Sequence, residues 1–521
     1  MGIRTVPHVA TRTIELMDTT LRDGEQTPNV AYAPSEKMQL ARLLLREIKV
    51  DRIEIANARI SEGEAEAVRG IMSWARKSRM APRIEILAYV DGRASVDWIV
   101  ANGGQAMNLL TKGSREHCEK QLRMTPERHF KEVGETIRYA GKHKLISNVY
   151  LEDWSSGVQN SFDYVFTAVE NLIDLGVERI YLADTLGILS PSDTTRYVSL
   201  MTRTWPDVHF EFHAHNDYGL AAANSLAAVE AGAHGVHTSV NGMGERSGNT
   251  RLAEVVAAIH DHSDCRTRIR ENRLIQVSEV VATFSGKIVA DNAPVIGRDV
   301  FTQTAGIHAD GDKKAGLYAN RLVPRRFGRK RRYALGKMSG KASLDQNLKA
   351  LGIKLLPENR NLVLKRIVEL GDKKHVVTPE DLPLIIADVL KKPAEELVKI
   401  ELYEIVTSKG DLPTASVTVR YRGEMVEAHS DGDGGYDAFM KALAKACRRF
   451  DLKIPRLVDY AVRIPPGGKT GALVETVITW RKSPRSQPYS TLGVDSDQLA
   501  AAVVATEKML NLVAAAGLSG D

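Results

Sequence analysis

Eight short apolar runs, each followed by a longer amphipathic stretch, occupy the first half of the chain and restrict its fold more than any other feature. The runs lie at residues 14–23, 52–58, 83–90, 106–113, 148–154, 179–187, 209–217 and 235–245. Stretches with helical periodicity separate them, as at 34–48 and 160–177. Eight strands that alternate with helices over roughly 250 residues predict an α/β fold, the (β/α)8 TIM barrel. A doubly wound open sheet is the alternative, but it normally has fewer strands and needs a nucleotide fingerprint after an early strand.

In the second half of the chain the pattern of apolar and polar residues changes twice. Residues 266–395 have mainly helical patterns, and from residue 396 two rounds of strands followed by a helix appear. The first round is predicted to hold the strands 398–406, 415–430 and 457–464 with the helix 435–450, and the second the strand 472–482, a turn and the helix 496–513. We therefore predict three parts. They are a catalytic barrel at 1–265, helical linker subdomains at 266–395, and an α+β domain with an internal pseudo-repeat at 396–521. The last part carries no evident catalytic cluster, so we expect it to serve binding or dimerisation.

Charged and polar residues gather where the predicted strands end. In a (β/α)8 barrel the carboxyl ends of all strands converge on one face, where active sites lie. Random surface placement would not concentrate these residues at strand ends while the strand interiors stay apolar. The residues concerned are Arg22, Asp23, Glu152, Asp184, Thr185, His213 and His215.

Two histidines in the stretch "FEFHAHND" (210–217) point to a metal. Residues two apart in a strand face the same side, so His213 and His215 lie together, opposite the phenylalanines. With Asp23 and Asn249 they offer two nitrogens and two oxygens, a mixed set that suits Mn²⁺, Mg²⁺, Zn²⁺ or Co²⁺ and leaves positions open for a 2-oxo acid. Such an ion polarises the ketone as a Lewis acid. Two polar residues at a sheet margin are the alternative.

Other residues at these strand ends have more than one interpretation each. Arg22 can stabilise a developing alkoxide or form a salt bridge at the barrel rim. Glu152 can act as a base, orient one, or be a structural carboxylate. Thr185 can bind a substrate carboxylate or cap a helix. The segment "NGMGERSGN" (241–249) lacks the full dinucleotide spacing, so its glycines more plausibly allow the tight turn that delivers Asn249.

Composition excludes several classes of protein. Cys118, Cys265 and Cys447 are far apart and odd in number, which favours a reducing compartment over a disulfide framework. No apolar run approaches a membrane span, and the amino terminus does not resemble a signal peptide, so we expect a cytoplasmic protein without membrane partners. The basic run at 325–332 has no nucleic-acid motif beside it. We expect it to be solvated or to meet an anionic substrate or a partner subunit.

Three motifs resemble a known family. "LMDTTLRDGEQTP" (16–28), "HAHND" (213–217) and "NGMGERSGNT" (241–250) are similar to signatures of the 2-isopropylmalate, homocitrate and citramalate synthases, and "TQTAGIHADG" (302–311) fits the region after the barrel. The resemblance covers nearly the whole chain. It implies a barrel, a helical linker and an end-product allosteric domain in a homodimer. It also implies an acyltransferase that condenses acetyl-CoA with a 2-oxo acid and hydrolyses the thioester.

The resemblance assigns roles to individual residues. Asp23, His213, His215 and Asn249 match the family's metal ligands. Arg22 matches the residue over the keto oxygen, Glu152 the acidic catalytic residue, and Thr185 the ligand of the substrate carboxylate. His308 matches a catalytic histidine that reaches the neighbouring subunit's barrel, and Tyr318 would accompany it. Sequence patterns alone would leave His308 as an ordinary loop histidine.

The acceptor pocket resembles that of the citramalate branch. Leu87, Leu110 and Tyr150 lie at or near strand ends, and three bulky groups would shrink the pocket to about a methyl group, favouring pyruvate. The product would be (R)-citramalate, a precursor of isoleucine. Core packing is the alternative role for some of these side chains, and one methylene separates substrates by only ~1–3 kcal/mol. The alternative is therefore a 2-isopropylmalate synthase of leucine biosynthesis that accepts 2-oxoisovalerate. No extra basic residue is evident for 2-oxoglutarate.

The carboxy-terminal domain resembles the branch's feedback domain. An apolar amino-acid pocket there would suit isoleucine, with leucine as the alternative, although several of its residues could simply form the domain core. The candidate effector residues are Tyr436, Asp437, Leu457, Tyr460, Ile464 and Val474.

Two alternative functions for the whole chain fit the sequence less well. An acyl-CoA lyase of the same barrel family needs a cysteine in a glycine-rich loop, and an inactive amino-acid sensor would have lost metal ligands.

Overall fold

The computed structural model describes residues 12–372, 377, 379–390, 398–463, 474–483, 486 and 488–517. The chain divides into two compact units. The first comprises Met1–Phe301 and Ala319–Lys330, and the second Thr302–Tyr318 and Arg331–Asp521. Each unit has its own fold.

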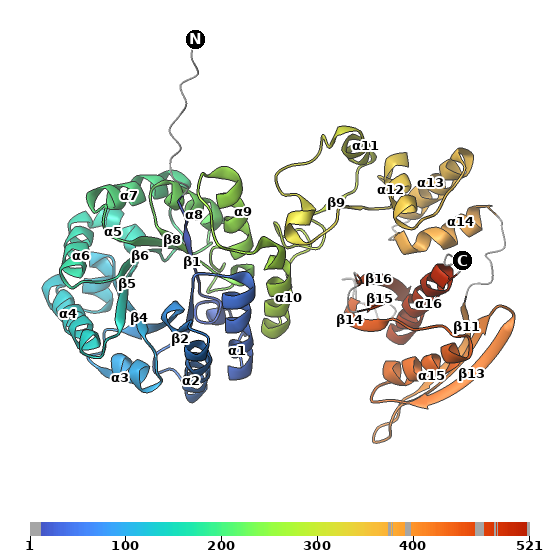
Figure 1. Ribbon diagram of the computed structural model, residues 1–521, viewed down its shortest axis with the longest axis horizontal. Coiled ribbons are helices and arrows are strands. Elements are labelled where there is room, and N and C mark those ends of the chain that lie inside the picture. Colours follow the sequence, from blue (N-terminus) through green and yellow to red (C-terminus); the bar gives the residue numbers. More distant parts are fainter. Residues whose placement is uncertain are drawn as a thin grey trace, which may run out of the picture. The chain divides into compact units, whose positions relative to one another are not determined.

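Eight parallel strands of the first unit close into a barrel (Figure 1), each bonded to the next in chain order and β8 to β1. The strands are β1 (Glu15–Asp18), β2 (Arg52–Asn57), β3 (Ile84–Tyr89), β4 (Ala106–Lys112), β5 (Ile146–Glu152), β6 (Arg179–Asp184), β7 (Phe210–Ala214) and β8 (Gly235–Thr238). The closure confirms the predicted (β/α)8 fold and rules out the open sheet. Their carboxyl ends share one face, which we call the barrel mouth.

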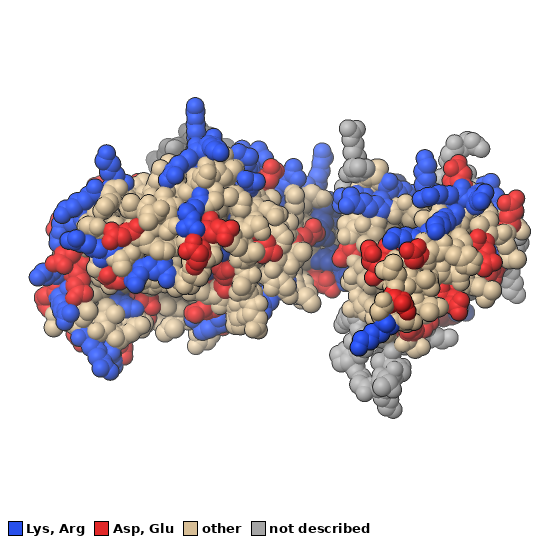
Figure 2. All heavy atoms as spheres, turned by 90° about the horizontal axis from the view of Figure 1, so that it is seen from below, with Lys and Arg blue, Asp and Glu red and all other residues tan. Residues whose placement is uncertain are grey.

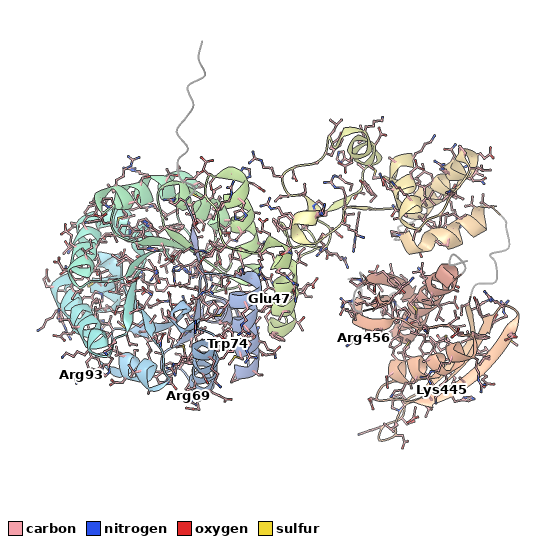
Figure 3. The ribbon with its side chains drawn as sticks, viewed as in Figure 1. Glu47, Arg69, Trp74, Arg93, Lys445 and Arg456 are labelled. Atoms are coloured by element: carbon pink, nitrogen blue, oxygen red, sulfur yellow. The ribbon has the colours of Figure 1, made fainter. Side chains whose placement is uncertain are left out.

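Helices surround the barrel (Figure 1). They are α1 (Pro34–Arg42), α2 (Glu62–Lys77), α3 (Ala94–Ala101), α4 (Pro126–Lys142), α5 (Trp154–Asn160), α6 (Phe162–Asp174), α7 (Pro191–Thr204), α8 (Ala221–Glu230), α9 (Leu252–His262) and α10 (Leu274–Ser285). Side-chain caps start several of them; Ser190 and Asp193 form a capping box before α7. On α2, Trp74 (labelled in Figure 3) packs under the guanidinium groups of Arg42 and Arg46, 5.7 and 5.1 Å from its ring centre.

Two predicted helices differ in detail. The helix predicted at 34–48 is α-helical only to Arg42 and continues as a π-helical turn, Leu43–Ile48, that ends at Lys49 with φ 68°. The helix predicted at 160–177 is α6, which a break at Ser161 separates from α5. Apolar spacing places such segments but does not specify the pitch of a last turn or a one-residue break.

The residues of β2 show how the barrel sorts its side chains. Ile53 and Ile55 belong to the apolar core, whereas Glu54 between them is buried in contact with Arg22 and Asn108. Alternation along β2 therefore sends its isoleucines to the outer core and the polar Glu54 to the barrel interior. Buried polar groups such as Glu54, unusual in a barrel normally filled by branched apolar residues, support the side chains of the mouth.

The second unit begins with short strands and a helical cluster. Strand β9 (Thr302–Gln303) pairs in parallel with β10 (Arg332–Tyr333), and α11 (Gly306–Ala315) lies between them in sequence. Helices α12 (Lys341–Ala350), α13 (Pro357–Asp372) and α14 (Leu382–Leu390) follow and share a small apolar core that includes Leu344, Val363 and Leu382.

Two antiparallel three-stranded sheets, each followed by a helix, complete the second unit and confirm the predicted pseudo-repeat. The first repeat is β11 (Lys399–Val406), β12 (Thr414–Tyr421), β13 (Glu424–Asp431) and α15 (Gly435–Arg449); the second is β14 (Arg456–Arg463), β15 (Val474–Arg481), β16 (Tyr489–Asp495) and α16 (Gln498–Gly517). Buried residues of both helices and both sheets form one core.

Three details of the predicted repeat were wrong. The single strand predicted at 415–430 is a hairpin of two strands, β12 and β13. The strand predicted at 457–464 belongs to the second round and not to the first, because β14 pairs with β15 and opens the second sheet. The turn predicted before α16 contains a further strand, β16, which pairs with β15 along its length. Alternation identifies a strand but not its partner, which depends on chain order and the connections between strands.

Basic and acidic side chains are mixed over the face drawn in Figure 2, in keeping with the small net charge of +6. Within the basic run at 325–332, Arg326 binds the carboxylates of Asp261 and Glu271, and Arg331 binds Asp312. These two arginines therefore have partners within the chain, which a run of like charges in the sequence does not reveal. In the part of the chain that is described, no helix has the length and apolar character needed to cross a membrane.

Candidate active site at the barrel mouth

Asp23 lies beside two histidines at the barrel mouth. Its Oδ2 is 3.3 Å from Nε2 of His213 and 4.0 Å from Nε2 of His215. All three side chains are buried, and one ligand atom of each lies within 4.8 Å of the others. The fold therefore brings three of the four predicted metal ligands into a group of the size that one ion requires. We call Asp23, His213 and His215 the metal group.

Asn249 joins this group through the backbone, since it forms an antiparallel bridge with His215. Its Nδ2 donates to the carbonyl oxygen of Met243 at 3.0 Å, whereas its buried Oδ1 has no hydrogen-bond partner among the described residues. Oδ1 of Asp23 is buried and unpartnered in the same way. Buried acceptors without donors are costly, and a divalent cation would satisfy both. The donor set of carboxylate, amide oxygen and imidazole nitrogen thus fits a divalent metal ion.

Glycines shape the loop that carries Asn249. Gly248 has φ 83°, and a Cβ there would lie 1.8 Å from the carbonyl oxygen of Gly242. At Gly244 a Cβ would lie 2.4 Å from Nδ2 of Asn249. At Gly248 only glycine allows one backbone segment to approach another so closely, and at Gly244 only glycine leaves room for the Asn249 side chain. The predicted tight turn of this segment is present.

Charge states at the mouth suit metal binding. Burial alone would raise the pKa of Asp23, but the Arg22 guanidinium, followed by a hydrogen bond from His213, holds it well below its usual range. Burial, followed by the neighbouring His213, lowers the pKa of His215 to about 4. A charged carboxylate and a neutral imidazole are the forms that ligate metals.

Arg22 connects the metal group with the barrel interior. Its Nε donates to Oε2 of Glu54 at 2.5 Å, its Nη1 is 3.5 Å from Oδ2 of Asp23, and its Nη2 donates to the Tyr150 hydroxyl at 3.4 Å. Burial opposes its charge, yet the carboxylates of Glu54 and Asp23 raise the pKa of Arg22 above its ordinary value. The guanidinium is therefore a fixed cation beside Asp23.

The three predicted acceptor-pocket residues come together. Leu87, Leu110 and Tyr150 belong to one apolar cluster inside the barrel, separate from the main core; its other members are Met17, Tyr89, Tyr181 and Ala183. The ring of Tyr150 meets that of His213 edge to face, with centroids 5.7 Å apart. The cluster thus borders the metal group through Tyr150.

Thr185 and Glu152 have partners of their own. The hydroxyl of Thr185 accepts the amide N–H of Asp153 at 2.8 Å, so part of its hydrogen-bonding capacity is structural. The carboxylate of Glu152 forms an ion pair with Lys112, the last residue of β4.

His308 and Tyr318 lie in the second unit. Their rings are 4.3 Å apart, and Gly311 makes room for this contact, because a Cβ there would lie 2.5 Å from the Tyr318 ring. The two side chains therefore lie in contact, and their reach into a partner subunit's barrel stays a prediction.

The candidate effector residues occupy different surroundings. Tyr436 and Tyr460 meet with ring centroids 5.0 Å apart, and the Tyr436 hydroxyl hydrogen-bonds Thr506 at 2.7 Å. Asp437 instead pairs with Lys441 at 2.7 Å. Of the others, Leu457 is 38% exposed on β14, Val474 is buried at the start of β15, and Ile464 lies outside the described residues.

Sequence reasoning missed three residues that support the mouth. Glu54 holds Arg22, Lys112 holds Glu152, and Arg246 binds Asp217 at 2.8 Å and donates to the carbonyl oxygen of Thr185 at 2.7 Å. Asp217 and Arg246 stand within the motifs at 213–217 and 241–250, which was the available signal. Glu54 and Lys112 stand in ordinary strands and gave none.

A second group of metal-competent residues lies at the opposite end of the barrel. Glu15, His209 and Glu211 approach one another within 4.8 Å. The Arg52 guanidinium already binds both carboxylates, so a further cation there would meet like charge. A cavity of about 680 Å³ beside it is lined by six basic residues and two acidic ones. Because its own residues satisfy its carboxylates, this end is a weaker metal site than the mouth.

Comparison with known proteins agrees with this architecture. Residues 13–281 match the HMGL-like family, residues 295–375 the homocitrate synthase post-HMGL domain-like family, and residues 376–514 the LeuA allosteric (dimerisation) domain.

Whole-length relatives carry synthase names. A putative (R)-citramalate synthase of Methanopyrus kandleri is 38% identical over 87% of this chain and 88% of that protein. An (R)-citramalate synthase of Methanocaldococcus jannaschii is 32% identical over 96% and 99%, and a probable 2-isopropylmalate synthase of M. kandleri is 34% identical over 89% and 91%. The chain therefore belongs to the HMGL-like family and, within it, to the 2-isopropylmalate, homocitrate and citramalate synthases.

Proposed function

We propose that this protein condenses acetyl-CoA with pyruvate and hydrolyses the thioester, giving (R)-citramalate and CoA, with a divalent metal ion at the barrel mouth. Condensation that depends on acetyl-CoA is the chemistry of its family. One observation carries the proposal: the Arg22 guanidinium touches both Asp23 of the metal group and Tyr150 of the apolar cluster. An oxo acid can therefore present its ketone and its side chain to two adjoining sets of residues.

The metal ligands proposed are Asp23, His213, His215 and Asn249. Mn²⁺, Mg²⁺, Zn²⁺ and Co²⁺ all accept such a mixed set, and a bound ion supplies Lewis acidity toward the ketone. Arg22, which Glu54 holds in place, donates hydrogen bonds to the keto oxygen as negative charge develops on it. Thr185 is proposed to bind the substrate carboxylate.

Acetyl-CoA has to lose a methyl proton before its carbon can attack. We assign this proton to Glu152, with His308 and Tyr318 of a second subunit completing the site. Loss of this proton leaves the C–H electron pair on an enolate of acetyl-CoA. The enolate carbon then forms the new bond to the keto carbon, and the keto oxygen takes up a proton. Water then splits the thioester, which releases CoA and makes the sequence irreversible.

Pyruvate is the proposed acceptor because the cluster is crowded. Leu87, Leu110 and Tyr150 pack together inside the barrel with Tyr89 and Met17, which favours a methyl over an isopropyl group. The relatives named as (R)-citramalate synthases support the same choice. A 2-isopropylmalate synthase, which would take 2-oxoisovalerate, is the alternative.

The carboxy-terminal region is proposed to regulate the enzyme. Its match to the LeuA allosteric (dimerisation) domain indicates an oligomer that binds an effector. We propose a homodimer, feedback inhibition by isoleucine, and a pocket built around Tyr436 and Tyr460. The proposed parts remain the barrel at 1–265, the linker at 266–395 and the regulatory domain at 396–521.

Release of the CoA thiol tests this function. We expect the protein with Mn²⁺ or Mg²⁺ to release CoA from acetyl-CoA fastest with pyruvate, slower with 2-oxoisovalerate and 2-oxoglutarate, and less in the presence of isoleucine. Preference for 2-oxoisovalerate would favour the alternative synthase. Cleavage of citramalyl-CoA to acetyl-CoA and pyruvate without net synthesis would favour an acyl-CoA lyase.

A further inference from the structure

The ion pair between Lys112 and Glu152 has no assigned purpose. Lys112 ends β4 and Glu152 ends β5, and the two are direct partners in the parallel register. The ammonium of Lys112 contacts Oε2 of Glu152. Only 10% of the lysine side chain and 21% of the glutamate side chain are exposed, so the pair is largely shielded from water.

The backbone on both sides of this pair is fixed. The amide of Gly113 donates to the carbonyl oxygen of Glu152 at 2.6 Å, and a Cβ on Gly113 would lie 2.8 Å from the Leu151 carbonyl oxygen. The Tyr164 hydroxyl donates to the Lys112 carbonyl oxygen at 3.2 Å, and the Lys112 amide donates to Nε2 of His129 at 3.3 Å. The two strand ends therefore cannot slide past each other without breaking these contacts.

The ion pair treats the two oxygens of the Glu152 carboxylate differently. A buried ammonium is costly unless it is paired, and Glu152 is its only carboxylate partner among the described residues. Three titratable side chains near the pair favour their neutral forms: burial, followed by Lys112, lowers the pKa of His129 to about 4, and burial raises the pKa of Tyr89 and Tyr164. In the described part of the chain, Oε1 of Glu152 has no hydrogen-bond partner. One carboxylate oxygen is thus anchored while the other can accept a proton.

We propose that Lys112 is a positioning residue, which holds Oε2 of Glu152 so that an ionised and correctly oriented Oε1 meets the acetyl methyl group. This inference rests on the proposed function, in which Glu152 removes the methyl proton. Lys112 itself touches no substrate. Its effect passes through the carboxylate, which distinguishes it from a residue that only stabilises the fold.

Lys112→Met, Lys112→Arg and the control Lys120→Met test the proposal. Lys120 is 77% exposed beyond the same strand, and among the residues that the structure describes its one carboxylate partner is Glu116. We expect Lys112→Met to lower kcat about 10²-fold with a small change in KM for pyruvate, because a misplaced base costs a factor of this size. The isotope effect with trideuterioacetyl-CoA should rise, because proton removal by a misplaced base becomes more nearly rate-limiting. Lys112→Arg should recover most of kcat.

A double-mutant cycle completes the test. In a Glu152→Gln background, Lys112→Met should cause no further loss, because a residue that acts through Glu152 has nothing left to position. This neutral double variant also avoids an unpaired buried charge, so it remains informative if Lys112→Met alone unfolds. An unchanged isotope effect, or an additive loss in the double variant, would overturn the proposal. Failure of the wild-type protein to release CoA with any acceptor would instead overturn the proposed function.

Discussion

At the residue scale, Arg22 shows what a motif reveals and what it hides. Its place beside Asp23 in "TLRDGE" was enough to predict a cation at the metal site. Its anchor, Glu54, was hidden because it alternates with Ile53 and Ile55, a pattern that equally suits a strand with one face in water. Only closure of the barrel turns that face inward, where Glu54 accepts a hydrogen bond from Arg22 at 2.5 Å.

Leu110 is predicted to limit the acceptor. Shortening it in Leu110→Ala should enlarge the pocket by the space of a branched side chain. The ratio of kcat/KM for 2-oxoisovalerate to that for pyruvate is expected to rise ~10-fold or more. Steady-state CoA release with both acceptors measures this ratio. An unchanged ratio, with both rates equally reduced, would mean that Leu110 only packs the core.

The buried carboxyl group of Asp18 should make the protein's free energy of unfolding depend on pH. Burial raises its pKa from 3.8 to about 7, against the opposing hydrogen bonds from Thr20. Because the folded state holds this proton more tightly than the unfolded chain, the group's contribution is complete below about pH 4 and is lost as pH rises through about 7. Asp18→Asn should therefore gain stability relative to the wild type by ~1 kcal/mol or more between about pH 5 and about pH 8. Denaturant unfolding at several pH values measures the difference, and a constant difference would contradict the assignment.

At the element scale, strands and their ends were the predictable part. Each apolar run became a barrel strand, and the ends brought Asp23, His213 and His215 together as predicted. Contacts between elements were not predictable, as the wrong placement of β14 and the unseen partner Lys112 show. Periodicity records which face of a segment is apolar, whereas pairing depends on geometry that only the assembled fold supplies.

The loop at 241–249 should be intolerant of added side chains. In Gly248→Ala the new Cβ would meet the Gly242 carbonyl oxygen and the backbone has φ 83°, so the loop has to move and carry Asn249 with it. Gly219→Ala is the matched control, because its φ is 73° but nothing lies within 4 Å of the new Cβ. We expect the control to cost about 1–2 kcal/mol from backbone strain alone. Gly248→Ala should cost more and also weaken Mn²⁺ binding ~10-fold or more. Unfolding free energies and Mn²⁺ titrations measure both, and equal behaviour of the two variants would contradict this reading of the loop.

At the scale of the whole molecule, the chain carries its proposed catalytic residues in two separate units. The metal group belongs to the first unit, and His308 with Tyr318 belongs to the second. Spacing in the sequence does not say whether such residues work within one chain or across a dimer. The resemblance to the synthase family predicts the second arrangement.

Hybrid dimers distinguish the two arrangements. Asp23→Asn and His308→Ala should each be nearly inactive alone. If His308 serves the partner subunit's barrel, mixed dimers contain one complete site, so equal mixing after dissociation should restore roughly a quarter of wild-type activity. CoA release from the reassembled mixture measures this. Absence of any recovery, with hybrids verified by mass spectrometry, would place His308 with its own barrel, whereas full activity of His308→Ala alone would place it outside the reaction.

Carbon-13 NMR of the product made from [2-¹³C]pyruvate and acetyl-CoA shows whether the barrel mouth catalyses a metal-dependent condensation. We expect no new signal from the metal-stripped protein. With added Mn²⁺, removed again before the spectrum is recorded, we expect a tertiary-alcohol carbon together with an equal amount of free CoA. Asp23→Asn should give no product under the same conditions. An unchanged pyruvate signal with the metal-loaded wild type, or equal product from Asp23→Asn, would contradict a metal-dependent condensation at the barrel mouth.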